Sequence, residues 1–269
     1  MSSGLYLDFV VASGSFSGLL ACRAWRQSKG FVACKRLLVA YAKQHSFETH
    51  WQARVVNNML LGCCLTAAAM ILRGMGVSTM PGSSLNAVIF AVTASVNLGI
   101  AAHILQCCCC LSMMVDDFCC NMMEHSDFND AMREWSLIHA LCREVSRTNQ
   151  VAFVVCQATG VAVAWVCIAG WRTGALDMVQ LLPGLLLVLA MVLVSALAAR
   201  VSDKCARASV LVNSSSDRTF DRDRMYVVDY IDHCQAGFYV FGVRITTSNV
   251  FKTMYVSCAV LFAALGCAA

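Results

Sequence analysis

A stretch of 31 residues without a single charged side chain, positions 85–115, constrains this chain more than any other feature of its sequence. As an α-helix it would be about 46 Å long, whereas the hydrocarbon core of a bilayer is about 30 Å thick. Such a helix must tilt or continue into the cytosol. The composition of the 269 residues agrees, because 59% are hydrophobic and only 13% are charged. We therefore predict an all-α, polytopic helical membrane protein.

Six segments of the sequence are expected to span the membrane. They are residues 5–22, 55–72, 85–115, 151–171, 178–199 and 253–269. The first is the weakest, because Asp8 interrupts it and serines and glycines dilute it. Between the spans, apolar residues recur at helical spacing from Phe128 to Val145, which predicts cytosolic helices.

The whole chain, 1–269, is interpreted as one transmembrane domain of about six spans. Its cytosolic helical regions are expected at about 116–150 and 200–252, as long extensions of the membrane helices. Inside the second region, the polar sequence NSSSDRTFDRDR is expected to be flexible.

The distribution of positive charge indicates the orientation. With six spans and both termini outside, the cytosolic segments hold 18 of the 20 Lys and Arg residues, and only Arg73 and Arg172 lie outside. Lys and Arg gather on the cytosolic side of membrane proteins. We therefore expect an integral membrane protein with an extracytosolic C-terminus, and the plasma membrane as its location.

The predicted spans contain few groups that could perform chemistry. They hold no facing pair of carboxylates, and the chain has neither a phosphate-binding glycine loop nor a serine nucleophile motif. Their polar residues are His103 and amides such as Asn97, which usually hydrogen-bond neighbouring helices. No Cys and His residues stand at metal-ligand spacing. We expect no enzyme, no metal or cofactor, and no nucleic-acid partner.

The sequence QCCCCLSMMVDDFCC is the most unusual local feature. One interpretation is S-acylation close to the cytosolic face, either at Cys107, Cys108, Cys109 and Cys110 or at Cys119 and Cys120. The other, which we favour, is that small polarizable thiols allow helices to pack closely.

The C-terminal region resembles a known superfamily. The segment AGFYVFGVRITTSNVFKTMYVSCAVLF is similar to the end of insect gustatory and odorant receptors and their gustatory-receptor-like relatives. Residues Ala236 to Tyr239 match the small residue, glycine and two aromatics of that family. In the last helix, Tyr255 and Phe262 match the aromatic positions of its T-Y and Q-F pairs, whereas Met254 and Leu261 replace the threonine and the glutamine. Residues 134–161 also look like the family's cytosolic helix leading into its fifth span, so the resemblance covers roughly residues 85–269.

The resemblance implies a chemosensory, ligand-gated cation channel subunit that lacks the first of the family's seven helices. Four copies would form a homotetramer in membrane lipid, with the last helix of each lining a central pore. The pore-lining candidates are Thr253, Tyr255, Cys258, Leu261, Phe262 and Leu265. A small organic ligand would bind among the outer halves of the other helices, at positions that include Asn86, Phe90 and Trp165.

Two other functions stay open, a solute transporter and a non-conducting membrane scaffold. Transporters usually have broken helices at corresponding positions of two related halves, and Pro81 and Pro183 do not correspond in that way. The oligomeric state separates these alternatives, because a monomer would leave the last helix without a pore to line.

Overall fold

A computed structural model describes residues 83–124, 128–174, 178–214 and 222–267, together with short stretches of the first 71 residues that include 11–18 and 39–41. These residues are almost entirely helical, which confirms the predicted all-α class. The elements are α4 (Ser83–Glu124), α5 (Phe128–Arg172), α6 (Met178–Ser214), α7 (Arg222–Cys234), strands β1 (Tyr239–Val240) and β2 (Val243–Arg244), and α8 (Thr247–Cys267).

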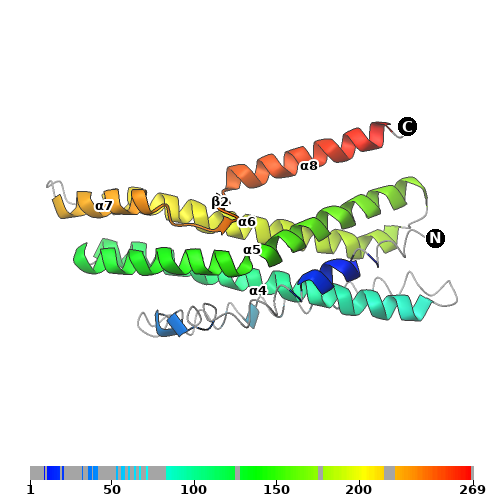
Figure 1. Cartoon of the computed structure of the whole chain (residues 1–269), viewed down its shortest axis with the longest axis horizontal. Coiled ribbons are helices and arrows are strands. Elements are labelled where there is room, and N and C mark those ends of the chain that lie inside the picture. Colours follow the sequence, from blue (N-terminus) through cyan, green and yellow to red (C-terminus); the bar gives the residue numbers. More distant parts are fainter. Residues whose placement is uncertain are drawn as a thin grey trace.

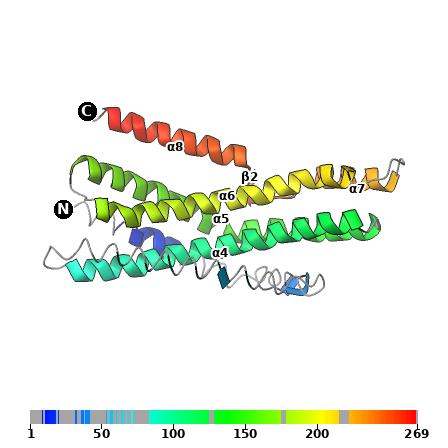
Figure 2. The same cartoon turned by 180° about the vertical axis from the view of Figure 1, so that it is seen from behind.

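Helices α4, α5 and α6 lie side by side along the long axis of the molecule, as two opposite views show (Figure 1 and Figure 2). At one end, α7 packs on α5 and α6, and the β1–β2 hairpin follows it. Helix α8 contacts α6 where it begins and then diverges from the bundle, running back toward the end where α5 is followed by α6 (Figure 1). The chain thus forms a long bundle with one helix standing apart.

Three described helices are long and apolar enough to cross a membrane, and this fits a membrane-embedded protein. They are α4 over Val92–Met123, α5 over Asp130–Arg172 and α6 over Leu181–Ser214. Six spans were predicted, so the structure does not reproduce that count. Much of the first and second predicted spans lies outside the described residues. Helix α8 covers the sixth as a helix whose side chains are described continuously only to Val260.

The apolar segments continue as unbroken helices beyond their predicted ends. The uncharged segment 85–115 belongs to α4, which runs on to Glu124, and the segment 178–199 belongs to α6, which runs on to Ser214. The segment 151–171 is the second part of α5, which has no break over 45 residues. Charged side chains therefore begin within unbroken helices rather than at loops.

One expectation for residues 200–252 was wrong, because the region contains a β-hairpin in addition to helices. Of the sequence expected to be flexible, residues 213–214 end α6 and residues 222–224 begin α7, and residues 215–221 lie outside the described part of the chain. Helix α7 forms because Val227 and Ile231, one turn apart, are buried where it packs on α5 and α6. Burial of this apolar stripe outweighs the weak helix propensity of its many aspartates.

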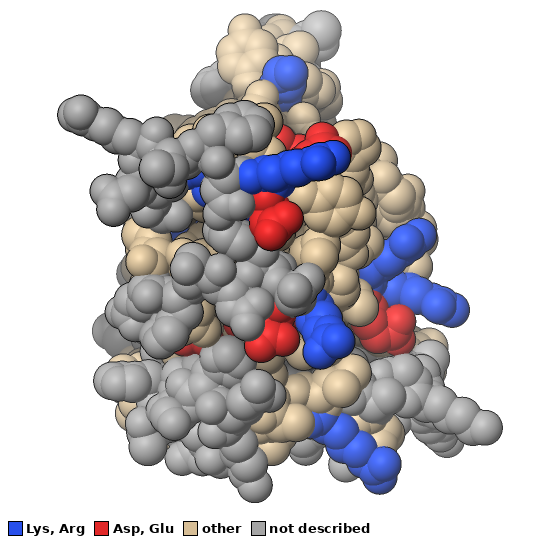
Figure 3. Space-filling model, turned by 90° about the vertical axis from the view of Figure 1, so that its left-hand side faces the viewer, with Lys and Arg blue, Asp and Glu red and all other residues tan. Residues whose placement is uncertain are grey.

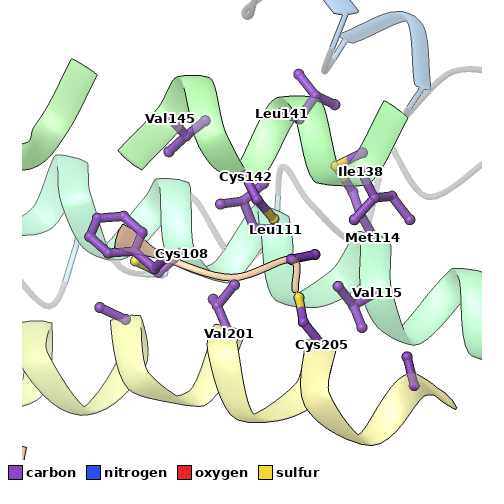
Figure 4. Packing of buried hydrophobic residues seen from close by; sticks show 14 of the residues in the cluster. Cys108, Leu111, Met114, Val115, Ile138, Leu141, Cys142, Val145, Val201 and Cys205 are labelled. Atoms are coloured by element: carbon purple, nitrogen blue, oxygen red, sulfur yellow. The ribbon is translucent and has the colours of Figure 1, made fainter. Parts of the chain in front are cut away.

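The larger core lies along the half of the bundle that carries α7. Buried apolar side chains of α4, α5 and α6 point toward one another there, among them Leu111, Cys142 and Val201 (Figure 4). The rings of Phe118 and Trp135, both fully buried, have centroids 5.0 Å apart. Figure 3 looks onto this end of the molecule, where Lys and Arg are interspersed with Asp and Glu on the surface. This half resembles a water-soluble helical bundle, with an apolar interior and a charged exterior.

A short helix at residues 11–18 packs closely on α4 and α5. Gly14 and Gly18 make this possible, because a Cβ atom at either position would overlap Thr159 or Ile100. In addition, Asn97 Nδ2 donates hydrogen bonds to Ser15 Oγ (2.5 Å) and Val11 O (3.2 Å). Small residues four apart and interhelical amide bonds both stabilise helix pairs in membranes. Asn97 therefore has the interhelical role expected for it.

Candidate functional site: the last helix and its connector

Helix α8 is apolar but exposed along its described length. The exposed fractions of Phe251, Tyr255 and Val260 are 66%, 77% and 59%. An apolar helix that its own chain leaves uncovered needs either lipid or another protein surface around it. The surface of α8 that the described residues leave uncovered therefore suits contact with lipid or with another protein surface.

The pore-lining candidates lie on this helix. Thr253, Tyr255 and Cys258 are exposed, and the Thr253 hydroxyl donates to the carbonyl of Asn249 (2.9 Å). Leu261, Phe262 and Leu265 belong to α8 by backbone, and their side chains lie outside the described part. The six positions thus share one helix that stands away from its bundle.

A tight connector, residues 235–246, joins α7 to α8. Gln235 follows α7 with a φ of 43°, the left-handed conformation that commonly ends helices. The hairpin pairs Tyr239 with Arg244 through a two-residue loop, Phe241 and Gly242, whose φ angles are 49° and 81°. Positive φ at both loop positions is typical of a type I′ turn, which matches the twist of paired strands.

Hydrogen bonds attach the connector to α6. The backbone N–H of Phe238 donates to Ser202 Oγ (2.9 Å). Arg244 Nη2 donates to the carbonyls of Ser202 (2.8 Å) and Ala236 (2.9 Å). Gly237 fits between them, because a Cβ there would lie 2.9 Å from Arg244 Nε and 3.0 Å from Ser202 Oγ. Only glycine fits at position 237, because any side chain would overlap these neighbours. Arg244, near the end of the connector, bonds both to α6 and to Ala236 near its beginning.

The connector is attached to α5 as well. The N–H of Tyr239 donates to Ser146 Oγ (3.0 Å), whose own hydroxyl donates to the carbonyl of Cys142 (2.6 Å). The rings of Phe153 and Phe238 pack with centroids 5.8 Å apart. Because α5 and α6 both hold the same short segment, a movement of one against the other would act on it directly.

The first turn of α8 continues this network. Thr246 Oγ1 accepts a hydrogen bond from the N–H of Asn249 (3.3 Å), as an N-cap residue does. Asn249 Nδ2 donates to the carbonyl of Arg244 (3.0 Å), and the Thr247 hydroxyl donates to Asp203 of α6. The base of α8 is therefore fixed to the bundle, whereas the rest of the helix is uncovered.

The sequence singled out the motif Ala236 to Tyr239, but it gave no indication of the residues that hydrogen-bond the connector. Ser146, Ser202 and Arg244 carried no signal of their own, since a serine inside an apolar helix and an arginine in a polar segment are common. The small residue, glycine and two aromatics were the one clue, because such a run indicates close backbone packing.

The other candidate residues fall elsewhere. Asn86 and Phe90 lie on α4, with side chains outside the described part, and Trp165 on α5 is 46% exposed. No contact described here joins these three positions, so the ligand pocket stays a prediction.

The four consecutive cysteines differ in accessibility. Cys108 and Cys110 are buried in α4, whereas Cys107 and Cys109 are half-buried. Cys107 Sγ lies 3.6 Å from His103 Nε2, one turn away on the same helix. Since acylation needs a thiol that an enzyme can reach, this arrangement favours the packing interpretation for Cys108 and Cys110.

Near the α7 end, Tyr41 attaches the N-terminal part of the chain to the bundle. It is 3% exposed, and its hydroxyl donates to Glu134 and lies 3.4 Å from Asp117 Oδ2. Burial, followed by the two carboxylates, raises the pKa of Tyr41 well above its usual range. Across the described ranges, His, Cys, Asp and Glu side chains form no group of three or more arranged to hold a metal ion.

No protein-family model and no curated protein matches the sequence. The geometry of α8 and its connector is therefore the basis for any functional proposal.

Proposed function

We propose that this chain is a subunit of a chemoreceptor-like, ligand-gated cation channel whose last helix lines a tetrameric pore. The observation that supports this most is the uncovered position of α8. It is an apolar helix of 21 residues that leaves its own bundle after a firmly attached base. Four such helices around an axis would cover part of one another's surface, and the remainder would face the pore or lipid.

The topology proposed with this function has six spans, with the C-terminus on the extracytosolic side of the plasma membrane. The half of the bundle that carries α7 would then stand in the cytosol. Its apolar core and charged exterior suit that place, as does the excess of Lys and Arg there.

Gating would act through the connector. A small organic ligand that shifts the outer part of α5 against α6 would pull on Tyr239 and Phe238, which bond to Ser146 and Ser202. The base of α8 would move with them. Apolar residues further along α8, such as Leu261 and Phe262, would open or close the pore by wetting and dewetting.

The experiment that tests this proposal joins oligomeric state with cross-linking at Cys258. The full chain is purified in mild detergent and its mass is measured by mass photometry. A bifunctional thiol reagent is then applied to the wild type and to Cys258→Ala. If four α8 helices meet at an axis, Cys258 lies near its copies, so cross-linked dimers form in the wild type and not in Cys258→Ala.

Cys120→Ala is the matched control, because Cys120 is also exposed but lies on α4. It should cross-link as the wild type does. A monomer, or cross-linking that persists in Cys258→Ala and disappears in Cys120→Ala, would overturn the pore arrangement and favour a transporter or a scaffold. Cation flux through liposomes that contain the tetramer then tests conduction itself.

A further inference from the structure

A basic cavity lies where α8 leaves α6. Its volume is about 370 Å³, and its lining consists of Ala196, Arg200, Asp203, Lys204, Arg207 and Thr247. The three cations stand on α6 at spacings of four and three residues, so they lie along one side of the helix. The cavity therefore holds a strip of three cations, with the carboxylate of Asp203 among them, next to the base of α8.

Among the described residues, the positive charges in this strip are only partly balanced. Lys204 Nζ donates to both carboxylate oxygens of Asp116, at 2.6 Å from Oδ1, and Asp203 accepts the hydrogen bond of Thr247. Arg200 and Arg207, in contrast, have no hydrogen-bond or ion-pair partner among the described residues. Two exposed guanidinium groups thus flank an anchored lysine, an arrangement that an anion would stabilise.

The position of the cavity along α6 decides which anion suits it. Residues 178–199 contain no charged side chain, and Arg200 is the first after them. Lys252 likewise precedes the apolar part of α8. The cavity therefore lies at the boundary between the apolar and polar parts of the bundle, which is the level of lipid headgroups in a membrane.

We propose that this cavity binds the phosphorylated headgroup of an anionic membrane lipid. Arg200 and Arg207 are two helical turns apart, about 10 Å along the axis. This spacing suits a headgroup with two phosphate groups, each bound by one guanidinium through paired N–H donors. Lys204, between them, adds positive charge while Asp116 holds it in place.

A headgroup in this cavity would also touch the base of α8. Thr247 belongs to both the cavity and the hydrogen bond that joins α8 to α6. The lipid would therefore fix the angle at which α8 leaves the bundle. The site needs no pore, so it stands independently of the channel proposal.

The test compares lipid binding by two charge-matched variants of the full chain. Arg200→Gln/Arg207→Gln removes both unpaired guanidinium groups of the cavity. Arg143→Gln/Arg147→Gln removes two exposed arginines of α5 that do not line it. Each protein is placed in phosphatidylcholine nanodiscs with a few per cent phosphatidylinositol bisphosphate carrying a fluorescent headgroup label, and binding is followed by energy transfer from the tryptophans.

A hydrogen bond to a charged group contributes roughly tenfold or more to binding, so we expect the cavity variant, which loses two guanidinium groups, to bind roughly 100-fold more weakly than the wild type. The α5 variant should bind within about twofold of the wild type, since it keeps the cavity. Equal losses in both variants, or no loss in either, would overturn the site. A soluble inositol phosphate that binds as tightly as the lipid, and only when Arg200 and Arg207 are present, would overturn the lipid as occupant.

Discussion

Substituting Gly237 with alanine should loosen the connector at the base of α8. The added methyl group would lie 2.9 Å from Arg244 Nε and 3.0 Å from Ser202 Oγ, both closer than ordinary van der Waals contact. Ser202 is fixed on α6, so the arginine must move by roughly half an ångström, which stretches its bonds to two carbonyls. Overpacking of this kind costs about 1–3 kcal/mol, and a weakened charge-assisted hydrogen bond adds to it.

One term opposes this loss, because replacing a loop glycine reduces the freedom of the unfolded chain by about 0.4–1 kcal/mol. The net destabilisation is therefore about 2 kcal/mol, which corresponds to a fall in Tm of roughly 4–8 °C for a chain of this size. The assay is thermal unfolding in detergent, followed by size-exclusion chromatography after heating.

Gly99→Ala is the matched control. Gly99 lies inside α4, and apart from its own helical turn and chain neighbours nothing lies within 4 Å of the added methyl group. The Tm of this variant should stay equal or rise, because alanine favours helix. If Gly237→Ala melts at or above the wild-type temperature while Gly99→Ala behaves as expected, the tight packing of the connector is refuted.

Three further predictions use the same measurement. Trp135→Ala should cost about 3–5 kcal/mol, because the ring is fully buried, whereas Trp171→Ala, at an exposed position, should leave Tm nearly unchanged. Phe241→Asn should raise stability by about 1 kcal/mol, because asparagine tolerates the positive φ of the hairpin loop better than phenylalanine does, and a lower Tm would contradict the turn type. Asp116→Asn should change stability by less than about 1 kcal/mol, since the side chains of Lys204 and Asp116 are 22% and 55% exposed, and a larger loss would mean a more buried ion pair.

The long helices could be predicted from the sequence because membrane helices carry a strong signal. The uncharged run 85–115 and the apolar run 178–199 are each longer and more apolar than loops usually are, which predicts membrane helices. The charged residues that follow each run predict that the helix continues into water. The spacing of apolar residues such as Trp135 and Ile138 likewise indicated a helix with one buried face, and both side chains are fully buried.

The connector could not be predicted in this way, because contacts from distant residues determine it. The loop residues Phe241 and Gly242 lack the Asn-Gly or Asp-Gly signature of a type I′ turn, so nothing local indicates a hairpin. Its bonds to Ser146 and Ser202 join positions far apart in the chain. The exposed position of α8 could not be predicted either, because an apolar sequence is the same whether lipid or protein surrounds the helix.

The unbroken course of α5 restricts how the length of this protein can vary in evolution. One residue inserted inside the helix would rotate everything beyond it by about 100°, so Trp135 and Phe153 could no longer face the same bundle. Seven inserted residues would nearly restore the alignment, leaving a rotation of only about 20°. Related chains should therefore keep a constant distance between the residues of α5 that face the core, and differ in length beyond its ends, before Phe128 or after Arg172.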